Sequence, residues 1–130
     1  MKIALLIARI LLGLIFLVFG INFFHDFMHV KPPAMSPTAA AFAGGLFGSG
    51  YFFQFLKVIE IISGLFLLLN RFTAFFLLVL LPITVNIFLF HAMLAPYGVP
   101  IGTTVIVLNL FLCIGYRKYY ASVFTVAPKV

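Results

Sequence analysis

Four long apolar runs divide the chain and constrain its fold more than any other feature. A helix that crosses the hydrocarbon core of a bilayer needs about 20 apolar residues, each adding about 1.5 Å. Four segments of the 130 residues reach or nearly reach this length: 3–24, 51–69, 72–94 and 101–119. We therefore predict an all-α fold, a four-helix transmembrane bundle that forms one membrane domain over residues 1–130.

The composition supports lipid, not water, as the solvent around this bundle. Hydrophobic residues make up 65% of the chain and charged residues only 8%, too few to cover a soluble domain of this size. The net charge of +6 does not indicate nucleic acid, because the basic residues are scattered at the ends of apolar runs. The lipid bilayer is the partner that the composition predicts, and nucleic acid is not expected.

The connection between the first two runs, residues 25–50, is longer than the others and carries a helix signal. Ser36 followed by Pro37 is typical of a helix start, and Gly48 is a suitable stop. We predict a short interfacial helix over about 37–47 in this first, outer loop. Its bulky side chains either dip into the membrane surface or cap the mouth of the bundle: Phe42, Leu46 and Phe47.

The distribution of Lys and Arg predicts how the bundle is oriented. Most of these residues fall at one end of the predicted bundle, and Lys31 alone lies in a loop at the other end. The positive-inside rule then places both termini in the cytoplasm and the long first loop outside. The basic residues behind this prediction are Lys2, Arg9, Arg71, Arg117, Lys118 and Lys129.

Five of the polar residues inside the predicted spans are the candidate ligand-binding residues. By rise per residue, Glu60 and Asn109 lie at a similar depth, Lys57 and Asn86 about a turn higher, and Arg9 nearer the basic end. Each needs a partner or a water-filled cavity, and Glu60 is the carboxylate available to balance Arg9 and Lys57. Two interpretations stay open: one shared ligand site, or a structural cluster that fixes helix register.

Three histidines form a weaker candidate group near the outer mouth. His25 and His29 are four residues apart, which on a helix would place both imidazoles on one face. His91, or Asp26, could supply a third metal ligand. Two histidines of one turn make a weak site, so we expect no stoichiometric metal.

The sequence shows no self-contained catalytic chemistry. Cys113 is the only cysteine, so an internal disulfide or dithiol pair is excluded within the chain. No phosphate loop or nucleophile triad is present, and the two carboxylates, Asp26 and Glu60, belong to different membrane depths. No intrinsic cofactor is predicted.

Two stretches carry a resemblance to a known family. Residues 9–20 read RILLGLIFLVFG, and residues 57–64 read KVIEIISG, followed by NRF at 70–72. In these motifs and their spacing the chain resembles the DoxX family of bacterial membrane proteins. The resemblance implies a four-helix bundle in the bacterial inner membrane. It also implies that the following are signature polar and small positions: Arg9, Gly13, Gly20, Glu60 and Gly64.

The resemblance also suggests a function. The family's namesake is similar to subunits of a thiosulfate:quinone oxidoreductase, and other members associate with oxidative-stress enzymes. This implies a redox-associated membrane subunit that binds a quinone or a lipid head group and works with a membrane, periplasmic or cytoplasmic redox protein. The cysteine pairs of some relatives are missing here, and Phe23 stands near where many relatives place a Lys. Any redox centre would therefore come from a quinone or a partner.

Two other functions remain open from the sequence. A noncatalytic assembly or scaffold subunit fits the lack of catalytic motifs. A small transporter is the third alternative, for which internal inverted repeats would be expected, and the sequence shows none.

Overall fold

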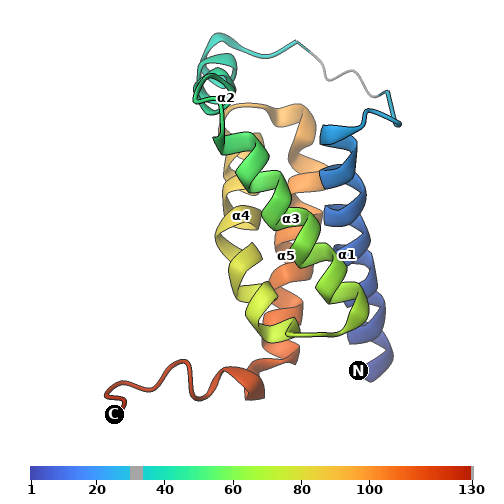
Figure 1. Cartoon of the computed structure of the whole chain (residues 1–130), viewed down its shortest axis with the longest axis vertical. Helices are drawn as coiled ribbons and strands as arrows, with labels where there is room; N and C mark the ends of the chain where they lie inside the picture. The colour runs from blue at the N-terminus through green and yellow to red at the C-terminus, as the bar shows by residue number, and fades with distance from the viewer. Residues whose placement is uncertain (30–33, 130) are drawn as a thin grey trace.

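A computed structural model describes residues 1–29 and 34–129 of the chain (Figure 1). Every regular element in these residues is helical, and four long helices lie side by side, as predicted. Both termini lie at one end of the bundle, here called the terminal end, and α2 lies at the other, here called the α2 end. The elements are α1 (Lys2–Phe24), α2 (Pro37–Gly48), α3 (Phe52–Leu69), α4 (Thr73–Met93), η1 (Pro96–Gly98), α5 (Val99–Gly115) and η2 (Arg117–Tyr120).

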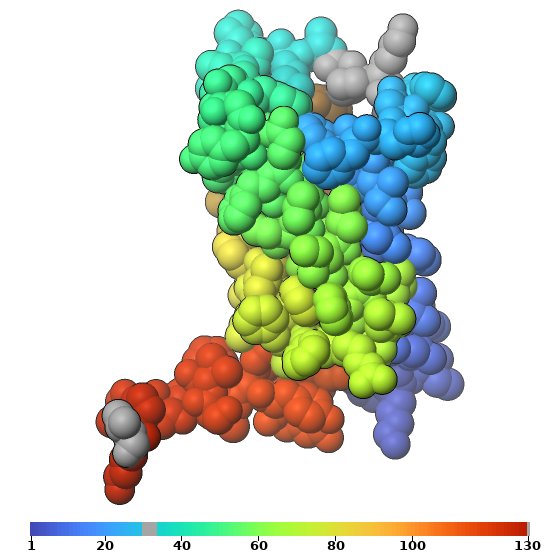
Figure 2. Space-filling model, viewed as in Figure 1, coloured from blue at the N-terminus to red at the C-terminus, as the bar shows by residue number. Residues whose placement is uncertain are grey.

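The outer surface of the bundle is apolar, as expected of a protein surrounded by lipid. Four segments are long and apolar enough to cross a membrane: α1, α3, α4 and the stretch Pro96–Gly115. Each of them exposes large apolar side chains on the outside of the bundle, among them Ile7, Phe55, Phe75 and Val107. Figure 2 shows residues after α5 running sideways from the terminal end. The chain is thus built as a multi-pass membrane protein.

The interfacial helix begins where the sequence predicted. The hydroxyl of Ser36 accepts a hydrogen bond from the Ala39 N–H at 3.2 Å and caps α2, and Pro37 occupies the first turn. The helix ends at Gly48, one residue beyond the predicted 47. The adjoining Lys31-Pro32-Pro33 segment, including the lone basic residue predicted for this side, lies outside the described residues.

Phenylalanine rings attach α2 to the bundle. Phe47 stacks on Phe53 of α3 with ring centroids 4.1 Å apart and on Phe23 of α1 at 6.0 Å. Phe42 packs against Phe90 of α4 at 5.5 Å. These contacts place α2 across the mouth of the bundle, while Phe42 and Phe47 stay partly exposed.

The last span differs from the predicted 101–119. Helix α5 begins earlier, at Val99, because η1 leads directly into it and Pro100 fits its first turn. It ends at Gly115, where Tyr116 leaves the helical conformation (φ −100°, ψ 18°). The remaining residues form the separate turn η2, so the predicted span was four residues too long at this end.

The closest helix contact in the bundle is between the backbones of α1 and α3. A Cβ placed on Gly64 would come within 2.7 Å of the Gly13 carbonyl oxygen and 2.8 Å of the Leu17 nitrogen. A Cβ on Gly13 would meet the Gly64 carbonyl oxygen at 2.9 Å. Because membrane helices gain no hydrophobic free energy from each other, such small-residue contacts are how they pack tightly. This contact sets the register of α1 against α3.

Replacement of Gly64 by alanine should therefore destabilise the bundle. The added methyl group meets backbone atoms that cannot move aside, and we expect a loss of about 1–3 kcal/mol in the free energy of unfolding in detergent. Gly44→Ala in α2 is the matched control, since a Cβ there has no atom within 4 Å. The control should unfold at the wild-type midpoint or slightly above it. Equal midpoints for both variants would contradict the close contact.

Candidate functional site

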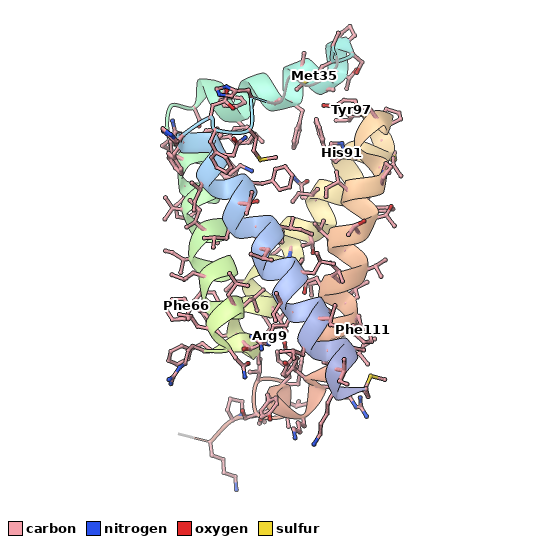
Figure 3. The ribbon with its side chains drawn as sticks, turned by 90° about the vertical axis from the view of Figure 1, so that its right-hand side faces the viewer. Arg9, Met35, Phe66, His91, Tyr97 and Phe111 are labelled. Carbon is pink, nitrogen blue, oxygen red and sulfur yellow. The ribbon has the colours of Figure 1, made fainter. Side chains whose placement is uncertain are left out.

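Arg9 of α1 reaches across to the end of α3. Its side chain is 7% exposed, and its Nη1 donates to the carbonyl of Leu67 and, at 3.3 Å, to that of Leu68. Figure 3 shows Arg9 in the lower part of the bundle, close to this helix end. These carbonyls lie in the last turn of α3, where the helix dipole is negative, and that of Leu67 also accepts the Asn70 N–H at 3.2 Å. The end of α3 therefore offsets part of the guanidinium charge.

Glu60 pairs with Lys57 on its own helix. The Lys57 Nζ lies 3.3 Å from Oε2 of Glu60, without the alignment of a hydrogen bond. The Glu60 side chain is 3% exposed and that of Lys57 is 20% exposed. The two charges cancel locally, so this pair does not need Arg9.

The structure does not bring Arg9 and Glu60 together. The carbonyl of Leu68, bonded to Arg9, is eight residues from Glu60 on α3, which is about 12 Å along the helix. Arg9 on one side and the Lys57–Glu60 pair on the other therefore form two separate sites. The prediction that the Glu60 carboxylate balances both cations was wrong. The position of each residue along its helix could not predict this separation. The partner of Arg9 is a backbone carbonyl, and the pattern of side chains in a sequence does not indicate such a partner.

Asn109 of α5 is fully buried and bonds to α4 beside Pro82. Pro82 has no N–H, which opens the adjacent turn of α4 to a side chain. In the orientation that satisfies both ends of the Asn109 amide, the amide nitrogen of Asn109 donates to the Leu77 carbonyl at 3.2 Å. Its oxygen accepts from the Thr84 hydroxyl at 3.1 Å and the Leu81 N–H at 3.3 Å. Asn109 thus links two helices, and Thr84 is a partner that the sequence reading missed.

Asn86 of α4 differs from the other polar residues, because no described side chain or backbone group hydrogen-bonds its amide. It lines two adjoining hollows of about 340 and 170 Å³ beneath α2, between α3 and α4. Both hollows also share Phe42, Leu46 and Leu56, and the rest of their lining is apolar. We call this region the Asn86 groove. It offers one amide donor and acceptor in aromatic and aliphatic surroundings.

The three histidines do not form the predicted arrangement. Helix α1 ends at Phe24, so His25 and His29 do not share a helical turn. His29 is exposed and lies 3.8 Å from Asp26, while Nδ1 of His91 lies 3.2 Å from the Ala95 carbonyl. Across residues 1–29 and 34–129, no three His, Cys, Asp or Glu side chains gather as metal ligands.

A larger hollow, about 390 Å³, lies at the terminal end between α4, α5 and the residues after α5. Cys113 and Tyr120 are among its lining residues, and the Tyr120 hydroxyl has no hydrogen-bond partner among the described residues. Burial raises the pKa of Tyr120 well above its usual range, with a smaller contribution from nearby Cys113. The phenol therefore stays neutral at physiological pH.

The fold and its buried polar residues define a small polytopic helical membrane protein. The DoxX family model matches residues 4–93, which cover α1 to α4. The chain belongs to the DoxX family. No match was found among curated proteins or among solved structures.

The separation of the charged residues can be tested with two double-mutant cycles. Glu60→Gln leaves the Lys57 ammonium unpaired in the bundle and should cost about 3 kcal/mol of unfolding free energy. Adding Lys57→Gln should recover part of this loss, because the unpaired charge is removed. Adding Arg9→Gln should instead give an additive loss. Thermal or denaturant unfolding in detergent measures both cycles, and coupling of Arg9 to Glu60 would contradict the structure.

Proposed function

We propose that this DoxX-family protein is a redox-associated membrane subunit that holds a quinone head group, or a lipid head group with a similar carbonyl, in the Asn86 groove. The observation that supports it is an unpaired amide in an otherwise apolar hollow at membrane depth. An amide N–H there can donate to a carbonyl oxygen with little competition from water. Of the five residues predicted to bind a ligand, Asn86 is the one whose side chain has no partner in the described structure.

The groove suits a flat ring better than a charged head group. Phenylalanine side chains from α2, α3 and α4 line it, and none of its described lining residues is a cation or a carboxylate. Aromatic faces contact a planar conjugated ring favourably. Pro82 also lies in the wall, and its ring adds to the apolar surface of the groove.

The protein itself would position the quinone and not supply electrons. Reduction of a quinone to its quinol needs two electrons and two protons, and the single thiol Cys113 cannot cycle as a dithiol. A redox protein in contact with the bundle would therefore provide the electrons. The role of this chain is to bind the ring and orient its carbonyl.

Quinone binding should depend on Asn86. In lipid nanodiscs, a short-chain quinone should bind Asn86→Leu about tenfold more weakly than wild type, because one hydrogen bond in an apolar site is lost. Gln54→Leu is the matched control: it removes an exposed amide from the same half of the bundle, outside the groove. Fluorescence quenching or isothermal titration measures the dissociation constant.

The outcome also separates the competing functions. No measurable quinone binding by the wild type would favour the scaffold role. If Tyr120→Phe lost quinone binding and Asn86→Leu kept it, the quinone site would instead be the larger hollow at the terminal end.

We further propose that the protein lies in the bacterial inner membrane with its terminal end in the cytoplasm. Six basic residues lie at that end, and no described Lys or Arg lies in the loops at the α2 end. Reporter fusions after Asn70 and at the C-terminal residue should both give a cytoplasmic signal. A fusion at Tyr97, in η1, should give a periplasmic one. The inverse pattern would overturn this orientation.

A further inference from the structure

A second hollow at the terminal end collects positive charge. Its volume is about 290 Å³, and its walls come from the start of α1, the α3–α4 turn and the residues after α5. Three cationic side chains line it: Lys2, Arg9 and Lys118. Lys118 lies over the Tyr119 ring, with its Nζ 5.1 Å from the ring centroid, and Tyr119 is also part of the wall.

The chain has no carboxylate side chain to balance these three charges. Its only acidic residues are Asp26 and Glu60. Asp26 follows the far end of α1, and Glu60 is paired with Lys57 in the span. The end of α3 offsets part of the Arg9 charge, but Lys2 and Lys118 have no ion-pair partner within residues 1–29 and 34–129. The counter-ion must therefore come from outside these side chains.

The hollow also has hydrogen-bond donors to spare. Both hydrogen bonds of the Arg9 guanidinium to α3 use Nη1, although the group has five N–H donors. The Asn70 side chain accepts from the Thr73 hydroxyl through Oδ1 at 2.7 Å, which leaves its amide nitrogen available. Cationic and amide donors around one hollow are the groups that bind phosphate oxygens.

We infer that this hollow binds an anionic phosphate group. Its position favours the head group of an acidic phospholipid over free phosphate. Lys2 begins α1 and Lys118 follows α5 by three residues, so both lie where a membrane span meets the lipid head groups. Leu5 and Leu6 form the adjacent wall and provide apolar contact for the start of an acyl chain.

Lipid retention tests the inference. Protein extracted from nanodiscs with equal phosphatidylglycerol and phosphatidylcholine should retain phosphatidylglycerol about tenfold in excess, as measured by native mass spectrometry. The double variant Lys2→Gln/Lys118→Gln should lower this preference to about twofold or less, because both flexible cations are lost. Neither side chain is part of the packed core, so the melting temperature should not change.

A charge-matched variant provides the control. Arg71→Gln/Lys129→Gln removes the same charge from the same end of the bundle, and neither residue lines the hollow. It should keep the wild-type preference. An equal loss in both double variants would mean that only the general charge of this end attracts lipid, and the inference would be overturned, as it would by a wild type without preference.

A second arm separates lipid from soluble phosphate. Delipidated protein should show no rise in melting temperature with inorganic phosphate compared with chloride at equal ionic strength. A rise that is lost in Lys2→Gln/Lys118→Gln, without any lipid preference, would refute the lipid assignment. Asn86→Leu should leave lipid retention unchanged, so this result is independent of the proposed quinone groove.

Discussion

The contact between the backbones of Gly13 and Gly64 organises the rest of the bundle. With no side chains between them, α1 and α3 approach closely enough for Arg9, one turn before Gly13, to reach the last carbonyls of α3. The same register places Gly20 against Ile61, next to Glu60. A side chain at either glycine would separate the helices and move the guanidinium away from its acceptors. Packing and charge compensation in this half of the bundle therefore depend on one contact.

Arg9, Glu60 and Asn109 find their partners among near neighbours and not in a common centre. The Arg9 guanidinium uses the end of a helix, Glu60 uses a lysine one turn away, and Asn109 uses the turn opened by a proline. Local pairing keeps the cost of burying each group low in a medium without water. The exposed Asn86 amide differs from these three, because it has no hydrogen-bond partner among the described residues.

The sequence was sufficient for the features that depend on local signals. Run length predicted the four spans, and the Ser36-Pro37 pair predicted the start of α2, because both effects arise within a few neighbouring residues. The arrangement of Arg9 and Glu60 was not predictable in this way. Depth along a helix does not say which neighbour a side chain faces, and a backbone carbonyl as partner leaves no mark in the sequence. The end of α5 at Gly115 was missed because no proline follows at the break and the chain continues at once into the short helical turn η2.

The four spans differ in length in an order that affects how the protein sits in lipid. Around the bundle, α1 has 23 residues, its neighbour α3 has 18, α4 has 21 and the Pro96–Gly115 segment has 20. Their average is about 20 residues, or about 30 Å, the thickness of a typical hydrocarbon core. Hydrophobic matching is therefore a property of the assembled bundle, in which the longer α1 and the shorter α3 lie side by side. In a thinner membrane the longest helix, α1, would have to tilt most.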